Sequence, residues 1–327
     1  MVKAALFSGD ALWPSEWKEG LGEKTLKEKM GVSESELTIF SSWFCPFAQR
    51  VWIAAEEKEV NYKWVEVNPY EVDAEAPGGY SKKQLPLEIK EQMYPEFVKA
   101  SPRGLVPAVE CDDERLAESD PIIEYIDGKF PKKGATLCSS DPYLRAYCRI
   151  WADHANANIQ RPYYRMLVEQ SDEARVKAYE DLLEGIRKFT AAMAPLEEGP
   201  YFLGKDFSYT DVSFAPFFQR ILWVGKAYRN IDLPKEDPAV KRILAWWDAV
   251  SKRKSVAKTL VSRDRLIASY SNYAENKATS DYAKSLMSSL SPTTRATSAL
   301  TKKDSLLPVV FAAFIAGLAI GLLKKGL

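Results

Sequence analysis

Cys45 lies in the stretch FSSWFCPFAQRVW, residues 40–52, between a short apolar strand and the start of an amphipathic helix. The first N–H groups of a helix have no partner within the helix, and with the positive end of the helix dipole they favour a thiolate over a thiol. Pro46 suits the first helical position, because no N–H donor is needed there. The stretch therefore predicts an ionised, nucleophilic cysteine. The alternative is a small buried hydrophobic residue, a role that cysteines often have.

This thiol lacks a partner for a local disulfide. A dithiol redox motif places its second cysteine three residues after the first, and residue 48 is alanine. The other cysteines, at 111, 138 and 148, form no C-x-x-C pair with one another. A single thiolate must take its second sulfur from another molecule, and we expect that molecule to be glutathione, bound through a mixed disulfide.

Composition excludes several other kinds of function. Lys plus Arg and Asp plus Glu both number 45, so no global field recruits nucleic acid. His154 is the only histidine, and the cysteines are scattered, so we expect neither a metal site nor a disulfide framework. The N-terminus has no sustained apolar run of the kind found in signal peptides, which favours reduced thiols in the cytosol.

The elements that must position Cys45 alternate as in a small α/β domain. Apolar runs, period-two alternation and helical periodicity predict, in chain order, strand 37–40, helix 46–58, strand 62–68, strands 104–111 and 114–119, and helix 119–130. An insert rich in proline, glycine and charge, at about residues 69–95, interrupts this order and is expected to be a loop. The order predicts an N-terminal thioredoxin-like domain over residues 37–131.

The second half of the chain predicts helices only. Helical periodicity occurs in four segments, which begin at Asp141, Asp172, Ser208 and Pro238. We therefore expect an all-helical C-terminal domain over residues 139–265. In the stretch DFSYTDVSF, Ser208 can cap a helix, and Asp211 stands three residues later as in a shortened capping box. We expect this box to stabilise the fold rather than to take part in chemistry.

Both ends of the chain differ from these domains. We expect residues 1–36 to be a loosely attached extension, and residues 266–305, rich in Ser, Thr, Ala and Lys, to be a weakly ordered linker. Residues 306–323 carry no charge and would span about 27 Å as a helix, close to the hydrocarbon thickness of a bilayer. They predict a transmembrane tail anchor that leaves the preceding domains in the cytosol, on the mitochondrial outer membrane in preference to the endoplasmic reticulum or peroxisome. The alternative is a terminal helix packed against the globular body.

Three motifs, FCPFAQR, GLVPAVE and ESDPIIEYID, stand in this order ahead of a helical second half. Together they resemble the omega class of the cytosolic glutathione transferases, over about residues 37–262. The resemblance implies a thioredoxin-like domain that binds glutathione as co-substrate, followed by an all-helical domain. It also implies a homodimer.

The resemblance assigns roles to single residues. In this class the cysteine that matches Cys45 carries the mixed disulfide, and the residue that matches Phe44 lies beside it at the glutathione site. Pro107 matches a cis-proline, whose geometry exposes the backbone of Val106 to pair with the cysteinyl part of glutathione in a strand-like manner.

Glu118 and Ser119 match the acidic and hydroxyl pair that holds the γ-glutamyl ammonium and carboxylate of glutathione. Without the resemblance they would predict only a helix cap. Trp246 resembles a tryptophan of the acceptor pocket, and core packing is the alternative. A lysine for the glycine end of glutathione has no single match, since Lys90 and Lys99 both fit.

Three functions fit these expectations. The first is a glutathione-dependent thiol transferase, in which Cys45 attacks a glutathionylated or oxidised substrate and a second glutathione releases it. The resemblance adds the reduction of dehydroascorbate. The second is conjugation of glutathione to a small electrophile, which usually uses a Ser or Tyr hydroxyl, whereas a cysteine tends to trap glutathione as a disulfide, so thiol transfer is favoured. The third is a non-enzymatic regulator tethered to a membrane through residues 306–323.

Overall fold

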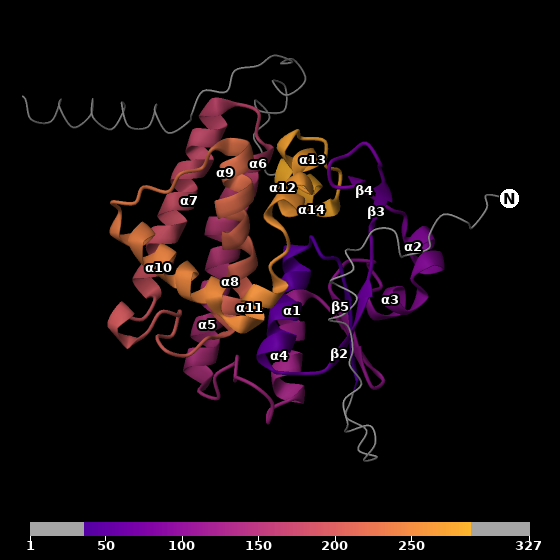
Figure 1. Ribbon diagram of the computed structural model, residues 1–327, viewed down its shortest axis with the longest axis horizontal. Helices are drawn as coiled ribbons and strands as arrows, with labels where there is room; N and C mark the ends of the chain where they lie inside the picture. Colours follow the sequence, from indigo (N-terminus) through magenta and orange to yellow (C-terminus); the bar gives the residue numbers. More distant parts are fainter. Residues whose placement is uncertain (1–35, 289–327) are drawn as a thin grey trace, which may run out of the picture.

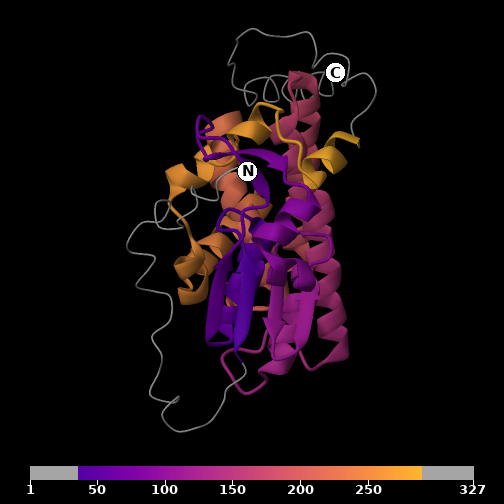
Figure 2. The ribbon, with the colours of Figure 1, turned by 90° about the vertical axis from the view of Figure 1, so that its right-hand side faces the viewer.

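The computed structural model describes residues 36–288, which form two parts side by side (Figures 1 and 2). The elements of the first part are β1 (Leu37–Ser41), α1 (Pro46–Glu57), β2 (Tyr62–Glu66), α3 (Pro95–Ala100), β5 (Ala108–Cys111), β6 (Glu114–Ala117) and α4 (Ser119–Lys129). The strands form one sheet in the order β2-β1-β5-β6, with β1 parallel to β2 and antiparallel to β5. Strand β6 pairs antiparallel with β5 at the edge. This topology confirms the predicted thioredoxin-like domain.

Alternation along the strands divides the apolar side chains between two faces of the sheet. Leu37 and Ile39 of β1 point to the face covered by α1 and α4, where they pack with Val51. Phe40 points to the opposite face and contacts Phe97 of α3, with ring centroids 6.0 Å apart. Both faces are therefore covered, and the packing fixes α1 relative to the sheet.

The insert at residues 69–95 is ordered, where the sequence predicted a loop. Its elements are β3 (Tyr70–Val72), β4 (Tyr80–Gln84) and α2 (Leu87–Met93). The two strands form an antiparallel hairpin, and the rings of Tyr70 and Tyr80 pack on Phe44 at centroid distances of 5.6 and 4.7 Å. The aromatic side chains of this proline-, glycine- and charge-rich stretch thus pack the hairpin against Phe44, the residue before Cys45.

The second part consists of helices, as predicted. They are α5 (Pro142–Ala155), α6 (Arg161–Val168), α7 (Asp172–Ala192), α8 (Tyr209–Arg220), α9 (Lys226–Arg229), α10 (Pro238–Lys252) and α11 (Lys254–Thr259). All residues of α8 are buried, and this helix packs against α5, α10 and α1. Because α1 also contacts α11, the helix that begins beside Cys45 forms the joint between the two parts (Figure 1).

The predicted capping box stands at the start of α8 and is confirmed. The N–H of Ser208 donates to Asp211 Oδ2 at 2.8 Å. The Asp211 carboxylate also accepts the N–H of Phe202 at 2.9 Å and the Nε1–H of Trp246 at 2.7 Å. Asp211 is fully buried, so protein donors replace water around this carboxylate. The box therefore joins α8 to α10 in addition to capping a helix.

Residues 266–288 differ from the predicted linker. They contain the end of helix α12 (Arg263–Ala268) and the whole of α13 (Ser271–Ala274) and α14 (Asp281–Ser288). Tyr270 and Tyr273 are buried in the same core as the rest of the helical part. This segment has few large apolar side chains, but the ones it has pack into the core and keep it in place. Composition alone does not show this packing. The hairpin of β3 and β4 lies beside it, where Asn272 Nδ2 donates to the carbonyl of Tyr80 at 3.3 Å (Figure 1).

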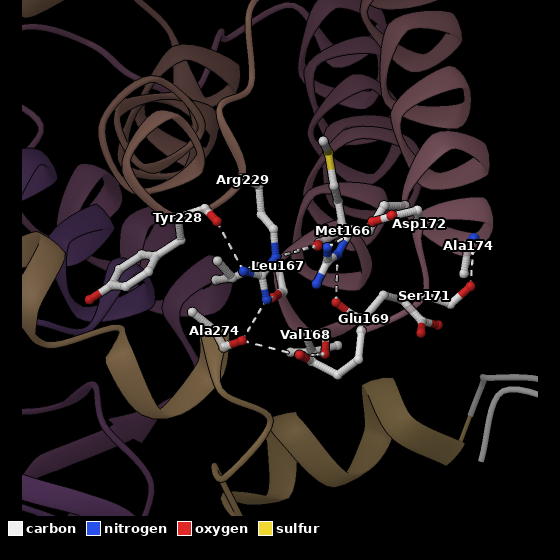
Figure 3. Close-up of polar contacts among 12 residues, drawn as sticks. Met166, Leu167, Val168, Glu169, Ser171, Asp172, Ala174, Tyr228, Arg229 and Ala274 are labelled. Carbon is white, nitrogen blue, oxygen red and sulfur yellow. Dashed lines mark hydrogen bonds and ion pairs between the residues drawn. The ribbon is translucent and has the colours of Figure 1, made fainter. Parts of the chain in front are cut away.

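Arg229 ties this C-terminal segment to the helical part (Figure 3). The last carbonyls of a helix have no partner within the helix, and the Arg229 guanidinium fills this role at the end of α6. Its Nε donates to Met166 O at 3.2 Å, and its Nη2 donates to the carbonyls of Leu167 and Ala274. Since Ala274 ends α13, one side chain secures both helices.

None of the helices within residues 36–288 is both long and apolar enough to cross a membrane. The longest, α7, carries charged side chains along its whole length. This finding corrects the predicted fold class, which included a transmembrane helix, and the predicted location on an organelle membrane. Residues 306–323, on which both predictions and the membrane-tethered regulator rested, lie outside the described residues, as do residues 1–35 and 289–305.

Candidate functional site

Cys45 lies where α1 begins, in a cavity of about 360 Å³ between the two parts of the molecule. It is the N-cap residue of α1, its N–H donates to Ser42 O at 2.9 Å, and Pro46 occupies the first turn as predicted. The cavity is lined by the six residues to which the resemblance gave a role at the glutathione site, namely Phe44, Cys45, Val106, Pro107, Glu118 and Ser119. Three motifs that are distant in the sequence therefore meet at one thiol.

The ionisation of Cys45 differs from the sequence prediction. Burial raises the pKa of Cys45, because the narrow cavity keeps bulk water away from the sulfur. The N–H of Ala48, the charge of Arg220, the N–H of Phe47 and the charge of Lys82 all act in the opposite direction. The helix N-terminus thus favours the thiolate as expected, but desolvation has the larger effect on the pKa of Cys45. The neighbouring positive charges therefore matter more for forming the thiolate.

The backbone of Val106 borders the thiol. The Val106–Pro107 peptide bond is cis, as the resemblance implied. The carbonyl oxygen of Val106 lies 3.9 Å from Cys45 Sγ. A peptide that lies beside Cys45 can therefore reach this backbone with its own N–H and C=O groups.

Glu118 and Ser119 stand at the start of α4, on the same cavity. Glu118 has a φ of 74°, which side-chain-bearing residues seldom adopt and which is typical of functional sites. Its carboxylate pairs with Arg103 at 3.1 Å on the surface. Ser119 is buried, and its Oγ accepts a hydrogen bond from Arg50 Nη1 at 3.3 Å. A carboxylate, a hydroxyl and a helix N-terminus at one place suit the recognition of both charges of an amino acid.

The sequence analysis missed Arg220, a buried side chain that supports the site through hydrogen bonds. Its guanidinium is fully buried and donates to Phe44 O at 3.0 Å, to Gln49 Oε1 at 2.8 Å and to Tyr270 Oη at 2.7 Å. Arg220 is the last residue of α8, far from Cys45 in the chain, and no local motif marks it. It links α8, the start of α1 and the C-terminal segment.

A second part of the cavity wall was also missed. It comes from the inserted hairpin and from the C-terminal segment, through Tyr70, Lys82, Gln84, Tyr270, Tyr273, Ser280 and Tyr282. Both segments lacked a strong periodic signal. Their tyrosines were the signal available, because large aromatic side chains in a turn-rich stretch indicate packing.

Trp246 does not belong to this site, and the prediction of a pocket tryptophan is wrong. Its side chain is fully buried in the helical core, stacks on Phe214 with centroids 5.2 Å apart and donates to Asp211. The two lysines left open for the glycine end of glutathione also lie elsewhere. Lys90 Nζ is buried and donates to Gly104 O at 2.9 Å, and Lys99 is exposed and pairs with a carboxylate of its own helix.

The described part of the chain, residues 36–288, contains no group of three or more His, Cys, Asp or Glu side chains that could hold a metal ion. The site consists instead of a thiol, backbone groups, a carboxylate and positive charges. Such a set suits a ligand that carries a peptide backbone, a thiol and charged ends.

Comparison with known proteins agrees with this description. Residues 44–129 match a family model described as the N-terminal domain of glutathione S-transferase. Glutathione S-transferase U16 of Arabidopsis thaliana is 30% identical over 191 residues, which cover 58% of this chain and 72% of that protein. The probable glutathione S-transferase parC of Nicotiana tabacum is 25% identical over 236 residues, which cover 72% of this chain and 94% of that protein.

A solved structure is similar over both parts of the molecule. Glutathione transferase Omega 3C from Trametes versicolor is 29% identical with a TM-score of 0.60, and the match covers 77% of this chain and 96% of that one. Fold, site and sequence thus lead to one conclusion. The chain belongs to the glutathione S-transferase family, whose members use glutathione as co-substrate.

Proposed function

We propose that this glutathione transferase is a thiol transferase of the omega type, with Cys45 as its nucleophile. The observation that supports the proposal is the place of Cys45, at the N-terminus of α1 and open to the cavity that the glutathione motifs line. The cysteines at 111, 138 and 148 do not line this cavity. The 29% identity to an omega glutathione transferase of Trametes versicolor favours the same class.

In the proposed cycle, the Cys45 thiolate attacks the glutathione sulfur of a glutathionylated substrate. The S–S bond of the substrate breaks, the substrate leaves as a thiolate, and glutathione stays on Cys45 as a mixed disulfide. The thiolate of a second glutathione attacks that disulfide, which frees the Cys45 thiolate and releases glutathione disulfide. In the net reaction the incoming glutathione is oxidised from a thiol to one half of glutathione disulfide, and the substrate sulfur is reduced from a disulfide to a thiol. Reduction of dehydroascorbate would instead oxidise two glutathione molecules to glutathione disulfide, and their two electrons and two thiol protons would pass to dehydroascorbate to give ascorbate.

The glutathione would lie along the cavity wall formed by the N-terminal part. Its cysteinyl backbone would pair with Val106, next to the sulfur of Cys45. Its γ-glutamyl end would lie at the start of α4, with the ammonium on Glu118 and the carboxylate on Ser119 and the first N–H groups of the helix. Phe44 would close the side of the site through its ring.

Glu118→Gln tests the γ-glutamyl assignment, because it keeps the shape of the side chain and removes its charge. We expect the affinity for glutathione to fall about tenfold, which corresponds to about 1.4 kcal/mol, near the low end for charge-assisted hydrogen bonds. The low end applies because the Glu118 side chain is 60% exposed, and water screens the contact. Titration calorimetry measures the change.

The matched control is Glu96→Gln, which alters an exposed carboxylate that pairs with Lys99 away from the cavity. This variant should bind glutathione like the wild type. If Glu118→Gln and Glu96→Gln bind equally well, Glu118 does not hold the ammonium.

Conjugation of glutathione to a small electrophile is a second candidate. Two observations favour it: the raised pKa of Cys45, caused by burial, and the tyrosine hydroxyls that line the cavity. A neutral thiol or a hydroxyl can donate a hydrogen bond to the thiolate of bound glutathione and leave it free to attack a substrate. The names of the plant relatives do not separate the two activities.

An acceptor panel separates the two candidates. The full chain is given glutathione with a glutathionylated peptide, with dehydroascorbate or with a chlorinated aromatic electrophile. Thiol transfer predicts faster turnover of the first two, with loss of both when Cys45 is alkylated. Faster turnover of the electrophile, unaffected by alkylation of Cys45, would contradict the proposed function and favour conjugation.

A further inference from the structure

Lys82 of the inserted hairpin is a buried cation on the wall of the cavity. Its side chain is only 3% exposed, and it lines the cavity together with Cys45. Within residues 36–288, no carboxylate forms an ion pair with its ammonium. The next residue, Lys83, is exposed and pairs with Glu71 at 2.8 Å. Because an unpaired charge is costly to bury, the position of Lys82 needs an explanation.

Three aromatic rings hold the ammonium. Lys82 Nζ lies 3.7 Å from the ring centroid of Phe44, 4.8 Å from that of Tyr70 and 4.7 Å from that of Tyr80. Each ring face attracts a cation, and the attraction grows where water is excluded. Burial lowers the pKa of Lys82, because the ammonium has lost its contact with water. An anion in the cavity would offset this cost.

The candidate for that anion is the thiolate of Cys45, which lines the same cavity and follows Phe44, the residue whose ring lies 3.7 Å from the ammonium. The titratable and charged groups that face Cys45 are Arg50 of α1, Tyr70 of β3, Lys82 of β4, Arg220 of α8 and Tyr270 between α12 and α13. Burial raises the pKa of both tyrosines, so they stay neutral.

The three cations differ in their partners. Arg50 pairs with Asp120 at 3.4 Å, and Arg220 donates to Phe44 O, Gln49 and Tyr270. Arg50 is therefore already compensated, and Arg220 is fixed by neutral acceptors behind the site. Lys82 lines the cavity itself, beside Phe44.

We propose that Lys82 is the counter-cation of the Cys45 thiolate, delivered to the site by the inserted hairpin. When Cys45 loses its proton to water, the ammonium and the thiolate form a charge pair across the cavity, which offsets the burial of both. The proposal rests on the proposed function, in which Cys45 is the nucleophile. In this proposal the hairpin supplies a positive charge that lowers the pKa of the desolvated Cys45 thiol, so that the thiol reacts near neutral pH.

The test is the pH dependence of Cys45 alkylation in the full chain. Iodoacetamide reacts with the thiolate, and mass spectrometry of the Cys45 peptide gives its rate separately from those of other cysteines. We expect Lys82→Met to raise the apparent pKa of Cys45 by about one unit or more, so that alkylation at pH 7 slows about tenfold or more. Lys82→Arg should stay close to the wild type, since it keeps the charge.

Lys83→Met is the matched control, one residue along the same strand, and should alkylate like the wild type. Methionine fills the aromatic box without a charge, so Lys82→Met should unfold at the temperature of the wild type or above it. Lys82→Gln provides a second neutral variant if the methionine variant proves less stable. An unchanged pKa of Cys45 in folded Lys82→Met or Lys82→Gln overturns the proposal.

The same samples separate this proposal from the proposed function. If wild-type Cys45 forms no mixed disulfide with glutathione, the proposed thiol transferase function is wrong. The difference in alkylation pKa between the wild type and Lys82→Met still reports whether Lys82 acts on Cys45. A pKa difference without a mixed disulfide would support the counter-cation alone.

Discussion

Cys45→Ser is expected to abolish thiol transfer, with turnover of a glutathionylated peptide reduced on the order of a thousandfold or more, as removal of a covalent nucleophile does in other enzymes. A serine hydroxyl cannot exchange with a disulfide, so the first step of the cycle has no nucleophile. Glutathione binding should persist, because Val106, Glu118 and Ser119 stay in place. Steady-state turnover and titration calorimetry on the same preparation measure the two effects.

Cys138→Ser is the matched control for this prediction. Cys138 is also partly exposed, but it does not line the cavity. Burial and the nearby carboxylates of Asp127 and Glu124 raise its pKa to about 12, so it stays a thiol. The control should turn over substrate like the wild type. Residual turnover in Cys45→Ser, or its loss in Cys138→Ser, would place the nucleophile elsewhere.

Asp211→Ala is expected to destabilise the fold by about 3 to 5 kcal/mol, because it leaves four buried donors without an acceptor at a cost of about 1 to 3 kcal/mol each, part of which relaxation recovers. The donors are the N–H groups of Phe202 and Ser208, the hydroxyl of Ser208 and the indole of Trp246. The loss also reaches the site, since α8 ends in Arg220, which holds the carbonyl of Phe44. The free energy of unfolding in urea measures the effect.

Two further variants make this prediction specific. Asp206→Ala removes an exposed carboxylate just ahead of the same helix and should change stability by less than about 0.5 kcal/mol. Asp211→Asn keeps one acceptor oxygen and should fall between the two. If Asp211→Ala unfolds at the same urea concentration as Asp206→Ala, the carboxylate does not carry the packing assigned to it.

Local patterns were enough to predict the thioredoxin-like domain. Leu37 and Ile39 stand two residues apart in a short apolar run, so they face the same side of a sheet, and helix α1 was visible from its apolar face. The capping box at Ser208 and Asp211 needed only their spacing. Cys45 itself was found because its chemistry follows from its place at a helix start. The domain limits and the homodimer stay predictions.

The rest of the site depends on contacts that spacing does not contain. Arg220 reaches Phe44 across the interface of the two parts, and Lys82 is buried in part by the rings of Phe44 and Tyr70, which are distant from it in the chain. Tyr270 lies in a segment whose composition predicted a linker. The raised pKa of Cys45 has the same origin, because desolvation depends on which distant segments cover the sulfur.

The most direct measurement for the central claim is the site of glutathione attachment. The fully reduced full chain is incubated with glutathione disulfide, free thiols are blocked at low pH, and peptides are mapped by mass spectrometry without reduction. The account predicts one glutathione, attached to Cys45. An adduct on Cys111, Cys138 or Cys148 with Cys45 unmodified would contradict it.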